Sequence, residues 1–177
     1  MMPAYTTALG TSSSAATIPV TLRQTRKNGV SAPVAAFTVP LCATIHLAGS
    51  TSKITAFSLA IIASQGMNVS AMQYAGFIFM LGIVMVAAPG VPGGAIMAAT
   101  GVLSSMLGFN ESAIALMIAT YIALDPFGTA TNVTGDGAIA IVIDRLAHGK
   151  FNDAKADPEN ARELSFDGMA YLDKVSV

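Results

Sequence analysis

The sequence predicts an all-α membrane protein in which two helical hairpins alternate with two broken transmembrane helices. The first observation is composition: hydrophobic residues make up 53% and charged residues 11% of the 177 residues, whereas soluble domains carry about 25% charged residues. The second observation is where the charges lie. Between Lys27 and Asp144 the acidic and basic residues are Lys53, Glu111, Asp125 and Asp136. Because so few charges cannot cover a soluble surface, the bilayer is the expected solvent of this region.

The first element, residues 1–29, is expected to be the arm and tip of a helical hairpin. A short apolar run is followed by the small, polar turn "TSSSAAT" at residues 11–17. An apolar segment then resumes, and Pro19 is acceptable there because proline is tolerated near a helix start. The basic loop "RQTRKNG" at residues 23–29 ends this element.

The second element, residues 30–65, is expected to be a broken helix. It contains Pro40, and the polar and small residues "HLAGSTSK" occupy its centre at residues 46–53. This pattern indicates a helix, an unwound link over those residues, and a second helix. A turn follows, in which Ser70 is a candidate N-cap of the next helix.

The third and fourth elements repeat this order. Residues 70–108 contain two apolar runs separated by the breaker "APGVPGG" at 88–94, which predicts a second hairpin with a Gly/Pro tip. Residues 110–147 are expected to be a second broken helix, with Asn110 as its cap and an interruption at "DPFGTATN", residues 125–132. The architecture therefore repeats after about 90 residues. Residues 148–177 are expected to form a polar cytoplasmic tail.

The basic residues predict the orientation of the chain in the membrane. One basic cluster flanks the first hairpin and a second flanks the last crossing, and cytoplasmic loops carry an excess of Lys and Arg. Both clusters are therefore expected on the cytoplasmic side, with an even number of crossings between them. The first cluster is Arg23, Arg26 and Lys27, and the second is Arg145 and Lys150.

Breaks and carboxylates inside the membrane indicate a binding site. Unpaired backbone groups in hydrocarbon cost several kcal/mol each, so irregular backbone survives only inside protein or beside a water-filled cavity. A carboxylate at the centre of a membrane helix costs roughly 2.5–3.5 kcal/mol. Asp125 and Asp136 beside such a break therefore favour a transport site, because broken helices that meet at the bilayer midplane are typical of secondary transporters.

Four motifs occur in an order and spacing that match a known family: "SSSAATIPVT", "PLCATIHLAGS", "APGVPGGAIM" and "NVTGDGAIA". Over about residues 12–150 the chain resembles the C-terminal part of dicarboxylate/amino acid:cation symporters of the glutamate-transporter type. The resemblance implies that both hairpins are re-entrant and that the chain is a partial elevator-type transport domain, which moves past a trimeric scaffold. Further N-terminal helices precede this part in the family, so a truncated or split-gene product is expected. Its expected partners are the bilayer, a small-molecule solute and scaffold helices from a split partner or a full-length paralogue.

The resemblance also implies site residues. Asp125 corresponds to the carboxylate that binds the α-amino group of the solute, and Asn132 to the contact with its main carboxylate. The implied substrate-binding set is Ser13, Ser14, Val91, Pro92, Gly93, Asp125, Thr129 and Asn132. The implied sodium ligands are Asp136, His46 in place of an Asn, and the backbone carbonyls of Cys42 and Asn132. No organic cofactor is implied.

Three departures from the family pattern bear on specificity. Gly128 stands where members that carry acidic substrates have Arg, so glutamate and aspartate are disfavoured as solutes. Ala48 removes the Asp of one sodium site, and Tyr121 replaces a nearby carboxylate. His46 adds a hypothesis of its own: histidine changes charge near neutral pH, so protons are a second candidate for the coupling ion.

The expected function is cation-coupled symport of an amino acid or dicarboxylate-like solute across the cell membrane, without enzymatic chemistry. Two alternatives stay open. The chain could be a non-transporting membrane fragment that associates with other subunits, or a channel lined by Asp125 and Asp136, although no filter motif is present. No basic patch suggests nucleic acid. The segment "GDGAIA" fits a loose dinucleotide-binding pattern, but no strand–turn–helix unit surrounds it.

Overall fold

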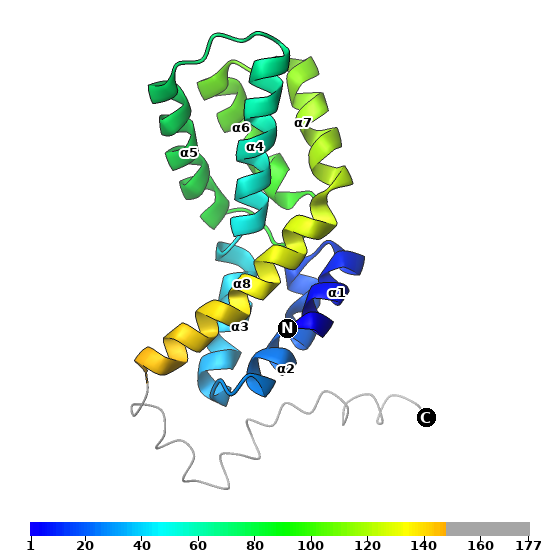
Figure 1. Ribbon diagram of the computed structural model, residues 1–177, viewed down its shortest axis with the longest axis vertical. Coiled ribbons are helices and arrows are strands. Elements are labelled where there is room, and N and C mark those ends of the chain that lie inside the picture. The colour runs from blue at the N-terminus through cyan, green and yellow to red at the C-terminus, as the bar shows by residue number, and fades with distance from the viewer. Residues whose placement is uncertain (148–177) are drawn as a thin grey trace, which may run out of the picture.

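The computed structural model describes residues 1–147, and all regular secondary structure in this range is helical (Figure 1). The predicted polar tail, residues 148–177, lies outside the described residues. The helices are α1 (Met2–Thr11), α2 (Ser14–Lys27), α3 (Ala32–Ile45), α4 (Ala48–Ser64), α5 (Ala71–Val86), α6 (Gly94–Leu107), α7 (Glu111–Ala123) and α8 (Asp125–Leu146). The all-α prediction is therefore confirmed for the described part of the chain.

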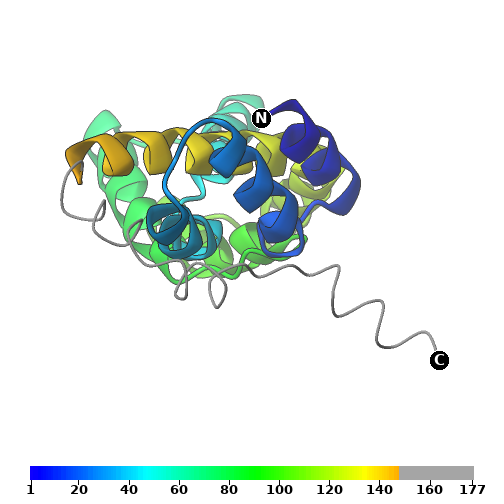
Figure 2. The same cartoon turned by 90° about the horizontal axis from the view of Figure 1, so that it is seen from below.

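The helices form two groups that α8 joins. Helices α4 to α7 make up the upper group in Figure 1, and α1 to α3 pack with α8 in the lower group. Seen from below in Figure 2, α8 runs across the lower group. Helix α8 contacts α1, α2 and α3 as well as α4 and α7, so its first turns lie where the two groups meet.

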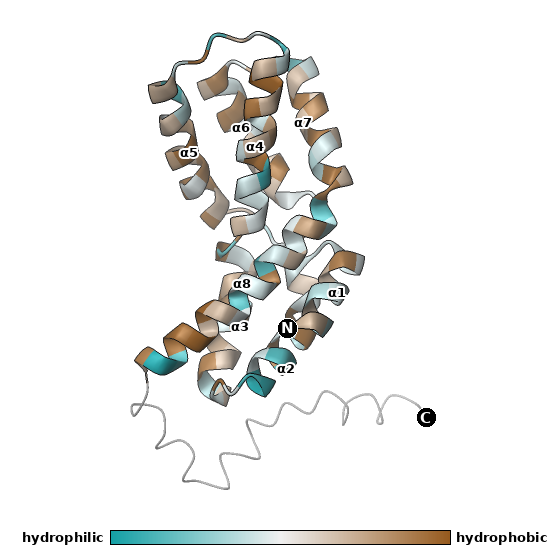
Figure 3. Ribbon diagram, viewed as in Figure 1, coloured by the Kyte–Doolittle hydropathy of each residue, from teal (hydrophilic) through white to brown (hydrophobic). Residues whose placement is uncertain are grey.

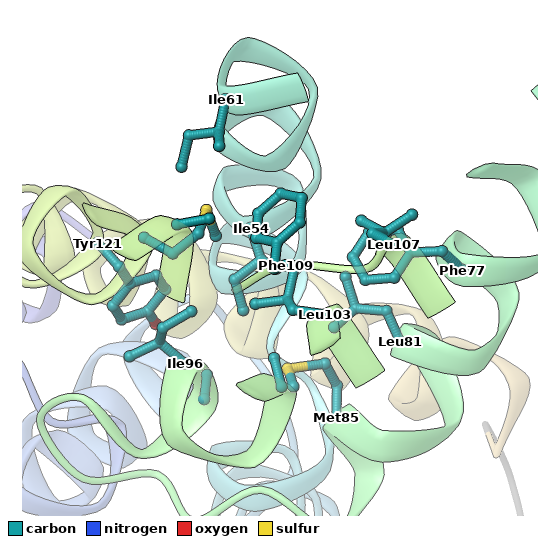
Figure 4. Close-up of a cluster of buried hydrophobic side chains, with 14 of the residues drawn as sticks. Ile54, Ile61, Phe77, Leu81, Met85, Ile96, Leu103, Leu107, Phe109 and Tyr121 are labelled. Carbon is teal, nitrogen blue, oxygen red and sulfur yellow. The ribbon is translucent and has the colours of Figure 1, made fainter. Parts of the chain in front are cut away.

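The upper group has a core of large apolar side chains. Ile54, Phe77, Leu81, Ile96 and Leu103 are fully buried there and come from α4, α5 and α6 (Figure 4). Tyr121 of α7 closes one side of this cluster. Truncating a buried residue of this size lowers the free energy of unfolding by about 2–5 kcal/mol. This core therefore holds α5 and α6 against α4 and α7.

The lower group is packed through small and hydroxyl-bearing residues instead. Ala4 and Ala8 of α1 are fully buried against Ala130 and Val133 of α8. The buried face of α2 consists of Ser14, Thr17, Thr21 and Thr25. Small residues let helix backbones approach closely, which is typical of helix packing in membranes.

The outer surface carries many large apolar side chains. Phe37, Met72, Phe79, Met97 and Phe127 are each more than half exposed, and much of α5, α6 and α7 is coloured hydrophobic in Figure 3. By length and composition, the segment Ala32–Ser64 could cross a membrane, and so could α7 and α8 if they are counted together as one span bent by 62°. Both observations agree with a membrane protein.

The predicted helical caps are confirmed. Ser70 Oγ accepts a hydrogen bond from Gln73 N at 3.2 Å, and Asn110 Oδ1 accepts one from Ala113 N at 2.9 Å. Helices α1 and α2 contact each other, as do α5 and α6, so each predicted breaker separates two packed helices. The first turn is shorter than expected: Ser12 has a left-handed backbone, with φ 49°, and α2 begins two residues later.

The expected extent of the first helix break is wrong. The link between α3 and α4 consists of His46 and Leu47, and residues 48–53 are the first turns of α4. Pro40 lies inside α3. The sequence contains small and polar residues in this segment, but they are helical, and a residue distant in sequence binds a backbone N–H in the first turn of α4: Gly49 N donates to Asn132 Oδ1 at 2.8 Å.

The expected extent of the second break is also wrong. Residues 125–132 are helical, and α7 and α8 are separated by Leu124 with a bend of 62°. Pro126 lies in the first turn of α8, where a helix needs no backbone N–H donor. The predicted interruption is therefore a sharp bend just before Asp125, and not an unwound stretch after it.

Candidate functional site

The first turn of α8 brings together residues from both helix groups. Asp125 is 4% exposed, and its two carboxylate oxygens have partners from two other elements. Oδ2 accepts a hydrogen bond from Gly93 N at 2.9 Å, and Oδ1 lies 3.1 Å from Lys53 Nζ. The carboxylate also lies at the N-terminus of α8, where the helix dipole favours negative charge. Asp125 therefore links the second hairpin tip and α4 to the start of α8 at the bend.

Lys53 of α4 is the cation of this cluster. Its Nζ lies 3.2 Å from Leu124 O and 3.8 Å from the centre of the Tyr121 ring. The side chain is 13% exposed. An aromatic face, a helix-end carbonyl and a carboxylate together satisfy an ammonium group that has left bulk water.

Gly128 provides the space that Lys53 fills. A Cβ atom at position 128 would lie 2.6 Å from Lys53 Nζ, so any larger residue there would displace the ammonium group. From the sequence pattern, this position was expected to lack a cation. The structure shows that α4 supplies a cation to the same space.

The two hairpin tips also meet at this place. Ser13 Oγ donates to Gly90 O at 2.8 Å, and Ala15 N donates to the same carbonyl at 3.1 Å. Ser13 additionally caps α2, because its Oγ accepts from Ala16 N. Ser14 is buried beside it, whereas Val91 and Pro92 are exposed at the second tip. Of the predicted tip residues, the structure thus brings Ser13 and Gly93 into the contacts between elements.

Asn132 and Thr129 lie further along α8 and are both buried. The Asn132 amide binds the start of α4: its Oδ1 accepts from Gly49 N at 2.8 Å, and its Nδ2 donates to Ser50 Oγ at 3.1 Å. The two helices cross closely there, because a Cβ at Gly49 would lie 2.8 Å from Thr131 Cβ. Asn132 therefore positions α4 against α8 at one edge of the cluster.

Asp136 forms a second cluster, one turn beyond Asn132. Its Oδ1 lies 2.8 Å from His46 Nδ1, and its Oδ2 is buried without a hydrogen-bond partner. His46 lies in the α3–α4 link, and its backbone N donates to Cys42 O at 2.9 Å. A buried carboxylate oxygen without a partner is costly, so this position suits a bound cation.

The expected ion ligands are thus only partly assembled. His46 and Asp136 are in contact at the α3–α4 link, Cys42 O accepts the His46 backbone N–H at the end of α3, and Asn132 lies one turn before Asp136 on α8. Within residues 1–147, no group of three or more His, Cys, Asp or Glu side chains could hold a metal ion. Backbone carbonyls at helix ends are the usual additional ligands of sodium in broken helices, and α3 ends beside this cluster.

Lys53 is the site residue that the sequence analysis did not assign. Its signal was present, because Lys53 is the one Lys or Arg between Lys27 and Arg145. A lone cation in an apolar region is usually paired with a carboxylate. Pattern alone could not say which of the acidic residues it meets, since Asp125 lies 72 residues away in the sequence.

The model of the sodium:dicarboxylate symporter family matches residues 1–146. Mouse excitatory amino acid transporter 4 is 33% identical over 150 residues, which cover 83% of this chain and 26% of that protein. Human excitatory amino acid transporter 1 is 29% identical, over 91% of this chain and 30% of that protein. A C4-dicarboxylate transport protein from Anaeromyxobacter sp. (strain K) is 26% identical, over 84% and 33%. The chain therefore spans about a quarter to a third of the length of these curated relatives.

Proposed function

The chain belongs to the sodium:dicarboxylate symporter family, and from that premise we propose that it forms the solute- and ion-binding part of a sodium-coupled symporter. The family is one of membrane transporters and not of enzymes. The relatives are named as transporters of excitatory amino acids and of C4-dicarboxylates, so the proposed solute is an amino acid or a dicarboxylate. The observation that carries the proposal is Asp125, a buried carboxylate at the point where both helix groups and the second hairpin tip meet.

The proposed solute position lies between the two tips and the first turns of α8. Asp125, Thr129 and Asn132 occupy successive turns of α8 on its buried side. In this proposal, Ser13, Ser14, Val91, Pro92 and Gly93 supply the cover. The bond from Gly93 N to Asp125 supports a gate at the second tip, because opening this tip would free one carboxylate oxygen for a solute.

The proposed sodium position lies beside Asp136. Its unpartnered Oδ2 is the feature that fits a cation, and the carbonyls of Cys42 and Asn132 with the His46 ring would complete the set. Ala48 carries no oxygen ligand in its side chain, so a second ion site that depends on a carboxylate at this position has lost that ligand. Sodium stays the proposed coupling ion, with protons as the second candidate.

The exposed apolar surface supports the proposed place of the chain in the cell membrane. In this proposal the chain is multi-pass, the two hairpins are re-entrant, and the C-terminal tail is cytoplasmic. Elevator-type movement would need scaffold helices from a partner chain or a full-length paralogue. The exposed side chains of Phe37, Phe79 and Phe127 would face either lipid or such a scaffold.

One observation favours a second candidate function. Both oxygens of Asp125 are already paired within the chain, by Lys53 and Gly93. A fragment that binds no solute and associates with other subunits would have no need to keep this carboxylate free. The two candidates make opposite predictions for solute binding.

Binding to the purified chain in lipid nanodiscs separates the two candidates. Labelled L-aspartate, L-serine and succinate would be tested in sodium chloride and in choline chloride. The proposal expects sodium-dependent binding of at least one probe, and loss of binding of the amino-acid probes in Asp125→Ala. Glu111→Ala is the matched control, because Glu111 is an exposed carboxylate in the first turn of α7. Absence of sodium-dependent binding for all three probes would contradict the proposal and support the second candidate.

A further inference from the structure

Lys53 lies on α4 and Gly128 on α8, and the Lys53 side chain fills the space that a side chain at position 128 would need. The ammonium group of Lys53 lies where a side chain at position 128 would begin, at 2.6 Å from the Cβ that a larger residue would carry. The absence of a side chain at Gly128 and the presence of a cation on α4 are therefore two parts of one arrangement. A cation is present at this edge of the cluster although α8 does not carry it.

The partners of the Lys53 ammonium group fix its position but leave it able to bind a further group. The Tyr121 ring and Leu124 O fix its position, at 3.8 Å and 3.2 Å. Asp125 shares its charge at 3.1 Å, but the Lys53 side chain remains 13% exposed. A lysine has three donors, so one of them can turn toward an incoming group without losing the other two contacts.

The charge of the cluster decides which group can approach. Lys53 and Asp125 neutralise each other, and a third charged side chain lies at Asp136, beyond Asn132 on α8. An ammonium group on a solute would have to compete with Lys53 for Asp125. A carboxylate on a solute would instead meet the Lys53 ammonium group, which is already in position. The Tyr121 ring compensates part of the desolvation of this ammonium group.

We propose that Lys53 is a specificity-determining residue of the solute site, whose ammonium group binds a carboxylate of the solute. The inference rests on the proposed function and names the solute class: an anion with two carboxylate groups, of which one is bound by Lys53. It replaces the expectation that Gly128 disfavours a second carboxylate. The position on α8 lacks the cation, and α4 supplies it.

The test compares succinate with L-serine on the full chain in nanodiscs with sodium chloride. Lys53→Met keeps the length and apolar stem of the side chain but removes its charge. We expect it to weaken succinate binding about 10- to 100-fold, because a hydrogen-bonded charge contact is lost. Serine binding should stay equal or become tighter, because Asp125 is released for an ammonium group. Lys53→Arg should retain succinate binding within a few-fold.

Two further variants control for position and fold. Gly128→Ala is expected to lower succinate binding without changing any charge, because its Cβ displaces the ammonium group. Lys27→Met removes an exposed lysine at the end of α2 and should leave both probes unchanged. If Lys53→Met does not fold, as judged by size-exclusion chromatography, the succinate-to-serine ratio of Gly128→Ala decides the question.

The outcomes separate this inference from the proposed function. Suppose that the wild-type chain shows sodium-dependent binding, and that Lys53→Met and Gly128→Ala leave the ratio of succinate affinity to serine affinity unchanged. This result would overturn the role of Lys53 but keep the transporter proposal. Equal losses for both probes would also overturn it, because they indicate a structural role. If the wild-type chain binds neither probe nor L-aspartate in sodium, the proposed function itself fails and this inference fails with it.

Discussion

Asp125 and Asp136 lie eleven residues apart on α8 and are both buried, yet their surroundings differ. Both oxygens of Asp125 have partners, one cationic and one a backbone N–H at the second hairpin tip. Asp136 has one oxygen beside His46 and one without a partner. Burial alone therefore does not tell what a carboxylate binds. Asp125 can bind a new group only by releasing Lys53 or Gly93, whereas Asp136 can bind a cation through the oxygen that has no partner.

Position along α8 explains the difference. Asp125 opens the helix at the 62° bend, where the end of α7 and the second tip leave room for groups from other elements. Asp136 lies in the middle of the helix and faces the α3–α4 link, where His46 is the side chain that reaches it. The ring of His46 packs directly against α8, since a Cβ at Gly135 would lie 3.3 Å from His46 Nε2.

The largest expected effect comes from Asp125→Ala. The substitution leaves Lys53 largely buried beside an aromatic ring without its counter-charge. We expect a loss of about 3 kcal/mol in the free energy of unfolding, at the low end for a broken buried pair because Lys53 is partly exposed. Denaturant titration in detergent micelles measures it. The double variant Lys53→Met with Asp125→Ala should recover much of the loss, and a stable single variant would contradict the pairing.

Asp136→Asn is expected to separate the two carboxylates by their response to sodium. At a sodium concentration 100 times the dissociation constant, a bound ion adds about 2.7 kcal/mol to stability. The variant should lose this increment, seen as an equal thermal midpoint in sodium chloride and choline chloride. The amide oxygen of Asn can keep the contact with His46 Nδ1, and the difference between the two salts is compared within each protein, so that a change in basal stability does not enter. A retained sodium response would place the ion elsewhere.

Gly49→Ala tests whether one helix crossing supports both clusters. The added Cβ would lie 2.5 Å from Gly128 O and 2.8 Å from Thr131 Cβ, so α4 and α8 must move apart. We expect a loss of about 2 kcal/mol in unfolding free energy, in the range for overpacking. Sodium stabilisation and succinate binding should both weaken. Gly82→Ala on α5 is the matched control, because a Cβ there meets open space.

His46→Asn has the smallest expected effect and sharpens the ion assignment. In the proposed ion site the His46 ring contacts Asp136 at 2.8 Å, and Asn is too short to keep this contact in the same way. We expect sodium stabilisation to fall by about 1 kcal/mol, which corresponds to a severalfold loss of sodium affinity. Thermal unfolding in sodium chloride and in choline chloride measures this, and an equal sodium response in the variant and the wild-type chain would rule out His46.

Much of the fold follows from local features of the chain. The Gly/Pro run at residues 88–94 ends two apolar runs, and Ser70 and Asn110 cap helices as their side chains predict. The extent of the two breaks did not follow, because it depends on distant partners. Gly49 stays helical since Asn132, 83 residues later, accepts its N–H. Pro126 fits in the first turn of α8 because the bend comes two residues before it.

Composition and local pattern predicted the helical class, the apolar surface that suits a bilayer, the two hairpin tips and the two carboxylates of α8. These follow from composition and local propensity, which set the solvent of the chain and the places where helices stop. Local pattern could not predict that Lys53 fills the space at Gly128, that Asn132 caps α4, or that one oxygen of Asp136 has no hydrogen-bond partner. These contacts join helices that are far apart in the sequence, and such helices come within reach of one another when the chain folds.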